Sequence, residues 1–321
     1  MYQKFILGIL VLMSIISCQH KDKLDVDVSK ISAKVKIRRF DKDFFGKTPN
    51  EFPKIKQKYP YIFPKNSPDS IWIKKMNDSL FLKLKLQVDS VFPDLKPYKP
   101  EISNLWKHIK YYYPTFKEPK IITIYSDWNY LNRAVYADSL MLISLDNFLG
   151  ENNMMYTGNI PKYIRQTMTP KHLIVEMAKS IINTQVAPPK NRELIYKIIN
   201  EGKKMYLLDA YLPEKPDRIK LGYTEKKLKW AKQNEEMVWK YFITNNLLYQ
   251  NKNDLERRFL NPAPYSKFYT EEDINSPGQI GIFIGRQIVH SFMQNNDVSL
   301  QKMILLPEEE IFKKSKYKPR K

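Results

Sequence analysis

The chain has 321 residues, of which 43% are hydrophobic, and its 54 basic against 34 acidic residues give a formal net charge of +20. This length allows one large domain or two small ones with a substantial core. The single cysteine excludes a fold held by intramolecular disulfides. The sequence has no recognisable nucleic-acid module, so we expect no nucleic-acid partner. The basic charge suits an anionic membrane surface, or reflects a composition rich in lysine, isoleucine, asparagine and tyrosine.

The first 18 residues have the pattern of an export signal that ends at a lipid-attachment site. Lys4 precedes an apolar run from Phe5 to Ile16, and Ser17 and Cys18 follow it. A basic start, a short apolar run and a small residue before the cleavage point are typical of such a signal. The run is shorter than the roughly 20 apolar residues that span a bilayer. Its closing letters, IISC, resemble a bacterial lipobox, so we expect cleavage before Cys18 and lipidation of its thiol, with palmitate among the acyl groups. The alternative is an ordinary cleaved signal with an incidental cysteine.

The chain therefore divides into three predicted parts. They are a signal peptide over residues 1–17, a lipid-anchored polar linker over residues 18–30 and a globular domain over residues 31–321. No later segment carries about 18 uninterrupted apolar residues, so we expect the body to be soluble. The expected location is the cell envelope, on the inner or the outer membrane, where the N-terminal lipid provides the membrane contact.

Patterns typical of strands lie early in the chain. They cover residues 33–40, residues 121–125 and residues 133–146, the last as a hairpin that turns near Ala137-Asp138. Between the first two, residues 49–68 are punctuated by proline, which indicates an irregular arm. Residues 70–91 have the apolar spacing of one helix. We expect these strands to form a small sheet.

From residue 161 onward the pattern is almost wholly helical. Helices are predicted over residues 172–185, after the helix-start signal Thr169-Pro170, and over residues 193–212, 225–248 and from Ser276-Pro277 onward. In the last of these, glycines at 278, 281 and 285 share one face and allow another element to approach closely. The tail over residues 307–321 is expected to be solvated. The predicted fold class is therefore α+β, with a small N-terminal sheet and a mainly helical C-terminal half.

Two of the predicted helices carry carboxylates in unusual positions. On the first, His172, Glu176, Lys179 and Asn183 share the stripe opposite the apolar face. On the second, Glu201 falls within an apolar seam, where a carboxylate needs a partner or takes a raised pKa. These four residues, His172, Glu176, Lys179 and Glu201, define a candidate cleft.

This arrangement is similar to zinc peptidases that carry H-E-x-x-H on one helix and a glutamate ligand on the next. Glu176 stands where the general base would be, and Glu201 where the third ligand would be. Val175 and Lys179 replace the two histidines, and Lys179 is expected to pair with Glu176 in place of the metal. Two alternatives remain open: an unorthodox metal site of His172, Glu176 and Glu201, or purely structural charges.

Several short motifs in the last 120 residues occur in combination. They are NEG at 200–202, RF at 258–259, PAP at 262–264, SKFY at 266–269, SPGQIGIFIG at 276–285 and IVHSFM at 288–293. Together with the lipobox they resemble the GldB family of gliding-motility lipoproteins over nearly the whole chain. That resemblance implies a membrane-anchored envelope protein needed for gliding and tied to type IX secretion, with other gliding-motility envelope proteins as partners.

The same resemblance implies a degenerate zincin-like metallopeptidase core, because the family is similar to predicted zinc peptidases whose metal motif is largely lost. We therefore expect a noncatalytic protein without a cofactor, a bound metal or catalytic residues. The two alternatives are an active zinc metallopeptidase that uses His172, Glu176 and Glu201, and an envelope module that binds a peptide or a glycan in the remaining cleft.

Overall fold

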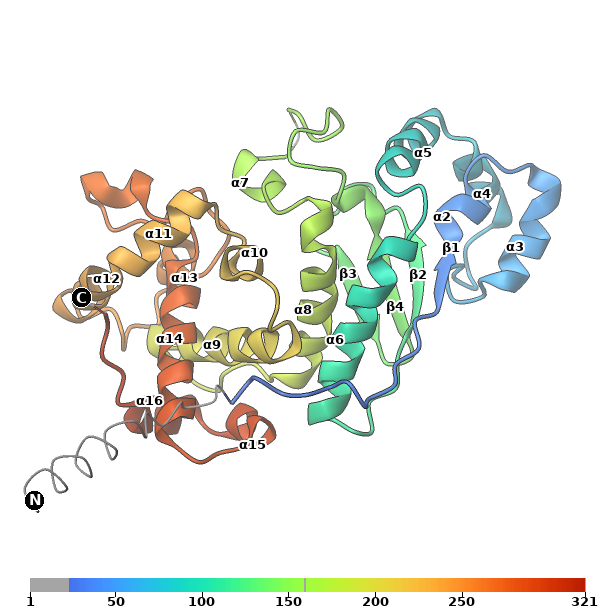
Figure 1. Ribbon diagram of the computed structural model, residues 1–321. Coiled ribbons are helices and arrows are strands. Elements are labelled where there is room, and N and C mark those ends of the chain that lie inside the picture. Colours follow the sequence, from blue (N-terminus) through green and yellow to red (C-terminus); the bar gives the residue numbers. More distant parts are fainter. Residues whose placement is uncertain (1–22, 159, 321) are drawn as a thin grey trace, which may run out of the picture.

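The computed structural model describes residues 23–158 and 160–320 and has an α+β fold (Figure 1). Its sheet has four strands in the order β1-β2-β4-β3. The strands are β1 (Ile37–Arg39), β2 (Lys120–Ile124), β3 (Ala134–Ala137) and β4 (Leu140–Ser144). β1, β2 and β4 are parallel, and β3 pairs antiparallel with β4 at one edge. The predicted fold class is confirmed.

All three predicted strand segments contribute to this sheet. Ile121 and Ile122 at the centre of β2 are fully buried, which explains the continuous β-branched run of that strand. The hairpin of β3 and β4 turns at Asp138, whose φ of 53° is left-handed, a conformation that aspartate tolerates better than most residues. The turn lies where the sequence predicts it.

Five α-helices lie between β1 and β2 in the chain. They are α2 (Phe40–Phe44), α3 (Phe52–Lys58), α4 (Asp69–Met76), α5 (Ser79–Val91) and α6 (Lys99–Tyr112). The prediction of an irregular arm over 49–68 was wrong in part, because α3 and a preceding 3₁₀ turn lie within it. The single helix predicted over 70–91 is two helices, because Asp78 accepts hydrogen bonds from the backbone of Leu80 and Phe81 and so begins a new one.

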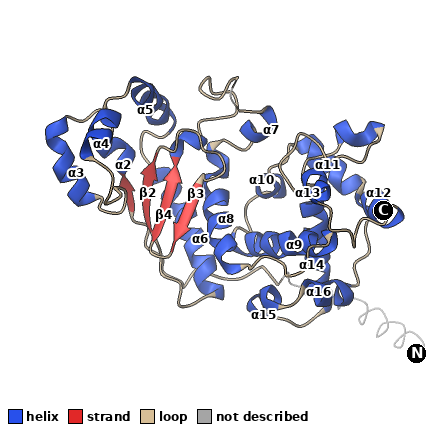
Figure 2. Ribbon diagram, turned by 180° about the vertical axis from the view of Figure 1, so that it is seen from behind, coloured by secondary structure: helices blue, strands red, loops and turns tan. Residues whose placement is uncertain are grey.

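The rest of the chain is helical, as predicted. Its helices are α7 (Lys162–Arg165), α8 (Leu173–Gln185), α9 (Leu194–Tyr211), α10 (Asp217–Leu221), α11 (Glu225–Gln233), α12 (Glu235–Thr244), α13 (Asn253–Phe259), α14 (Ile280–Asn295), α15 (Leu300–Leu305) and α16 (Glu308–Ser315). Figure 2 shows α9 to α16 on the side of α6 and α8 that faces away from the strands.

Three predictions in this half were wrong. The helix expected over 225–248 is broken at Asn234 into α11 and α12. α14 begins at Ile280 rather than at Pro277, because Gln279 has a left-handed φ of 59° and the Ser276 hydroxyl bonds the Ser266 backbone instead of capping the helix. The tail is not simply solvated: α16 packs on α14 and buries Ile311 completely.

Helices α9 and α14 form the tightest crossing of the fold. A Cβ atom on Gly202 would lie 2.2 Å from the carbonyl oxygen of Gly285, and one on Gly285 would lie 2.0 Å from that of Ile198. No larger residue fits at either position without separating the helices. The prediction that the glycine segment admits another backbone is confirmed at Gly285 and at Gly278, although Gly278 lies in the loop before the helix and not on its face.

The N-terminal segment over residues 23–36 runs along the outside of the helical half toward β1 (Figure 1). The Lys23 ammonium donates to the carbonyl oxygen of Asn296 at 2.9 Å, and Leu24 is buried. Further on, Lys110 donates to the carbonyl of Ser32 at 3.1 Å. The described part of the predicted linker therefore packs on the body. The signal peptide and Cys18 lie outside the described residues.

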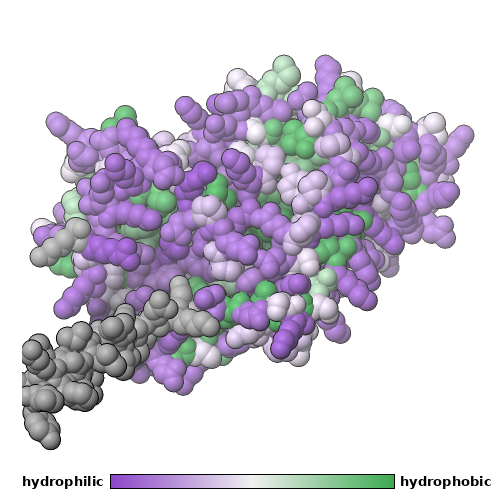
Figure 3. Space-filling model, viewed as in Figure 1, coloured by the Kyte–Doolittle hydropathy of each residue, from purple (hydrophilic) through white to green (hydrophobic). Residues whose placement is uncertain are grey.

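The visible surface is mostly hydrophilic, with hydrophobic residues in small separate groups (Figure 3). Within residues 23–158 and 160–320, no helix combines the length and the apolar character needed to cross a bilayer.

Candidate functional site: a cationic cleft beside α8

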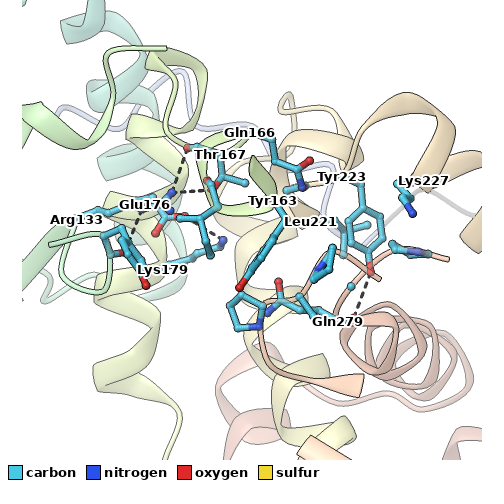
Figure 4. Close-up of a pocket in the computed structure, with 18 of the residues that line it drawn as sticks. Arg133, Tyr163, Gln166, Thr167, Glu176, Lys179, Leu221, Tyr223, Lys227 and Gln279 are labelled. Atoms are coloured by element: carbon cyan, nitrogen blue, oxygen red, sulfur yellow. Dashed lines mark hydrogen bonds and ion pairs between the residues drawn. The ribbon is translucent and has the colours of Figure 1, made fainter. Parts of the chain in front are cut away.

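A cleft of about 290 Å³ lies between α8 and the helices of the C-terminal part. One wall carries Arg133, Glu176 and Lys179, and the opposite wall carries Tyr223 and Gln279 (Figure 4). The cleft is also lined by Tyr130, Leu131, Tyr163, Ile164, Gln166, Thr167, Leu221, Gly222, Lys227, Pro262, Ala263, Pro264, Pro277 and Gly278. It therefore combines charged groups with tyrosine and proline surfaces, as ligand-binding clefts commonly do.

Glu176 and Lys179 form an ion pair at 3.1 Å on the exposed face of α8, three residues apart. Burial alone would raise the pKa of Glu176, but the positive charges of Lys179 and Arg133 lower it below its usual value. The carboxylate is therefore ionised at neutral pH and already holds a cation.

Arg133 is only 7% exposed and reaches the cleft from the residue before β3. Its Nε donates to the carbonyl of Tyr130 at 3.1 Å, and Nη1 donates to the carbonyl and hydroxyl of Thr167 at 3.1 and 2.8 Å. Burial lowers the pKa of Arg133, although the charge of Glu176 opposes that effect. An arginine nevertheless stays protonated in proteins, so this wall keeps a buried positive charge.

The loop that carries Tyr130 and Arg133 is held by a buried carboxylate. Asp146 accepts hydrogen bonds from the backbone nitrogens of Ser126 and Trp128, at 3.1 and 2.8 Å. Burial raises the pKa of Asp146 to about 6 against the lowering effect of these bonds. The bonds fix a left-handed bend at Trp128 and so position the cleft wall.

Two loops and α11 form the opposite wall. A Cβ on Gly278 would lie 2.1 Å from the carbonyl oxygen of Ala263, so only glycine lets the two proline-rich loops pack side by side. The Tyr223 hydroxyl donates to the carbonyl of Gln279 at 3.2 Å. Lys227 on α11 donates to the carbonyls of Ile274 and Ser276 at 2.7 and 2.5 Å. These contacts hold the wall opposite Glu176.

The other two candidate residues do not line this cleft. His172 is buried at the start of α8, where its Nδ1 lies 2.8 Å from the Thr169 hydroxyl. Burial and the charge of nearby Lys179 lower its pKa to about 4, although the charge of Glu176 opposes them. Glu201 pairs with Lys204 at 2.6 Å and lines a neighbouring cavity. Lys179 lines both cavities. Among the described residues, no group of three or more histidine, cysteine, aspartate or glutamate side chains could hold a metal ion.

Arg133, Tyr163, Tyr223, Lys227 and Gln279 were missed by the sequence analysis. Each belongs to a different segment, and none has a local pattern that marks it as a ligand contact. One signal was available. The PAP motif at 262–264 and the SPG motif at 276–278 were noticed, and Pro262, Ala263, Pro264, Pro277 and Gly278 all line the cleft.

The fold and the site define an α+β protein with a cationic cleft between its helices. The family model described as gliding motility protein GldB matches residues 21–319, and the chain belongs to that family. It is therefore a gliding-motility protein, as the sequence motifs predict. Searches of curated proteins and of solved structures found no match. The similarity to zinc peptidases stays a prediction.

Proposed function

We propose that the protein is an envelope lipoprotein that supports gliding as a noncatalytic component of the gliding and type IX secretion machinery. The observation that carries the noncatalytic role is the pairing of both candidate carboxylates. Glu176 is bound to Lys179 and Glu201 to Lys204. A general base works best with a pKa near the working pH, and the pKa of Glu176 is lowered instead.

The proposed anchor gives the cleft a definite position. Lys23 follows Cys18 by five positions, a distance along the chain that spans at most about 18 Å when fully extended. Lys23 contacts Asn296 at the end of α14, so a lipid on Cys18 keeps that end near the membrane. Gln279, at the other end of this 16-residue helix, lines the cleft. Because such a helix is about 24 Å long, the cleft lies well away from the anchor point.

Two substitutions in gliding cells test the anchor and the noncatalytic role together. Cys18→Ala is expected to release the protein from membranes or to block its processing, and to abolish gliding, because the anchor is lost. Glu176→Gln is expected to leave both gliding and protein abundance unchanged, because no proton transfer is required. The measurements are membrane fractionation at low and high salt, immunoblotting and colony spreading.

Three outcomes would contradict the proposal. Cys18→Ala protein that stays with membranes at both salt concentrations would exclude the lipid as the anchor. Loss of gliding in Glu176→Gln at normal abundance would indicate a working cleft that requires this carboxylate. Stoichiometric zinc in the purified protein would favour the active metallopeptidase.

A further inference from the structure

Among the residues that the structure describes, Arg133 is a buried cation without an ion-pair partner within 4.0 Å. Its three hydrogen bonds all go to neutral oxygens, namely the carbonyls of Tyr130 and Thr167 and the Thr167 hydroxyl. Within the part of the chain that the structure describes, no carboxylate oxygen lies within 4.0 Å of its nitrogens. Buried arginines in proteins are almost always paired with an anion, because an uncompensated charge is costly to remove from water.

The rest of the cleft compensates this charge only in part, through the more distant carboxylate of Glu176. Arg133, Lys179 and Lys227 line the cleft, and Glu176 is the one carboxylate among the lining residues. Glu176 Oε1 is committed to Lys179 at 3.1 Å. The Lys227 ammonium bonds only carbonyl oxygens, which carry no net charge. The lining therefore has a surplus of positive charge, and its most buried cation faces the cavity.

The remaining walls suit a short peptide. Tyr163 and Tyr223 present rings, Pro262 and Pro264 present apolar surface, and their combined faces can cover side chains and peptide planes. The amide nitrogens of Gln166 and Gln279 donate to backbone carbonyls at 3.1 and 2.9 Å, and their amide oxygens can accept from a peptide backbone. A volume of about 290 Å³ accommodates the end of a peptide rather than a long segment.

We propose that this cleft binds a peptide through a carboxylate group, with the Arg133 guanidinium as its main contact. This inference rests on the proposed noncatalytic function, because it makes the cleft a binding site instead of a hydrolytic one. Tyr130 and Thr167 take the hydrogen of Nε and both hydrogens of Nη1, so Nη2 is the nitrogen left to donate to a carboxylate oxygen of the ligand. Lys179 contributes a second positive charge while it stays paired with Glu176, and the tyrosine and proline walls cover the adjoining residues of the peptide.

The binding test uses the full chain in detergent and three mixtures of N-acetylated tetrapeptides. The first mixture ends in a free carboxylate, the second ends in an amide, and the third ends in an amide but carries aspartate as its last residue. Affinity selection with mass spectrometry identifies binders, which are then titrated. We expect binding of the first or third mixture and none of the second, and the two positive arms distinguish a chain end from a side chain.

Three variants assign that binding to the cleft. Arg133→Met is expected to weaken it at least tenfold, because a hydrogen-bonded charge contact is lost. Glu176→Gln is expected to strengthen it about threefold or more, because the one carboxylate of the lining no longer repels the ligand. Lys204→Gln, which removes a charge outside the cleft, is the matched control and should change nothing.

The expected increase in peptide affinity of Glu176→Gln tests the proposal even if Arg133→Met folds poorly. If Glu176 had only a structural role, its substitution would not strengthen binding. Equal binding of the amide mixture, weaker binding by Glu176→Gln, or binding of only inorganic phosphate or glucuronate would overturn the proposal. These results are separable from the proposed function, which depends on gliding, fractionation and zinc content. If no peptide binds but gliding, fractionation and zinc content are as expected, the peptide-binding proposal is wrong and the proposed noncatalytic role still stands.

Discussion

Two clusters of buried charge in this protein differ in whether their charges are balanced. Asp209 on α9 accepts two hydrogen bonds from Arg286 on α14, at 2.6 and 3.0 Å, and pairs with Lys220 at 2.5 Å. His290 lies 2.8 Å from the same carboxylate, and Asp217 takes a further bond from Arg286 at 2.7 Å. In the cleft, Arg133 has no such partner among the described residues.

This contrast separates a structural network from a binding site. Burial by itself would raise the pKa of Asp209, but hydrogen bonds from His290 and Arg286 and the charge of Lys220 hold it well below its usual range. Every member of that network is satisfied by the protein itself, so it fastens α9, α10 and α14 together. In the cleft, the described residues place no carboxylate next to Arg133, and a ligand can supply that anion.

The largest expected effect is the loss of stability in Asp209→Asn. The substitution leaves Arg286 and Lys220 buried with a single carboxylate, Asp217, and breaking such a network typically costs about 3–5 kcal/mol. The measurement is urea unfolding of purified protein at pH 7. Lys314→Gln, which breaks an exposed pair with Glu310, is the matched control and should cost below about 1 kcal/mol. Equal losses in the two variants would show that the Asp209 network contributes no more than a surface pair.

The next effect concerns His172, which is buried at the N-terminal end of α8. Its folded pKa of about 4 lies below the ordinary 6.5, so the unfolded chain takes up a proton more readily and stability falls as the pH drops from 6.5 toward 4. The full shift corresponds to about 3 kcal/mol. We expect the stability gap between wild type and His172→Asn to shrink over this range, because asparagine does not titrate.

Urea unfolding at pH 7, 5.5 and 4.5 measures the difference in stability between wild type and His172→Asn. A difference that stays constant with pH would contradict the lowered pKa of His172. The difference between the two proteins is needed because Asp146, with a pKa raised to about 6, acts in the opposite direction. A raised carboxyl pKa contributes stability at low pH that is lost as the pH rises. This contribution is present in both proteins and cancels.

The smallest effect is expected for Glu201→Gln. Its pair with Lys204 is partly exposed and three residues away on the same helix, and such pairs contribute about 0.2–0.5 kcal/mol. Urea unfolding and the peptide titration should both stay close to wild type. A loss of several kcal/mol in the free energy of unfolding, or a change in peptide binding, would contradict this expectation. It would indicate that Glu201 acts together with Glu176 and that the two cavities are not separate sites.

The local sequence pattern was sufficient to predict those helices, strands and turns that are specified by their own residues. The β-branched run of β2, the Ala137-Asp138 turn and the apolar stripes of α8 and α9 were predicted, because strand and helix periodicity is a property of a few consecutive residues. It was insufficient where a single residue ends an element, as at Asp78 and Asn234. The glycines that admit a close helix crossing were recognised, but their partner helix was not.

The sequence by itself determined the family, the α+β class and the pairing-prone carboxylates on α8 and α9. Only the tertiary structure decided which charges meet. Arg133 and Thr167, like Asp209 and Arg286, are 34 and 77 residues apart along the chain, and their distances depend on how the loops and helices pack. Because the energy of a buried charge depends on every group that surrounds it, no short segment reveals whether that charge is balanced.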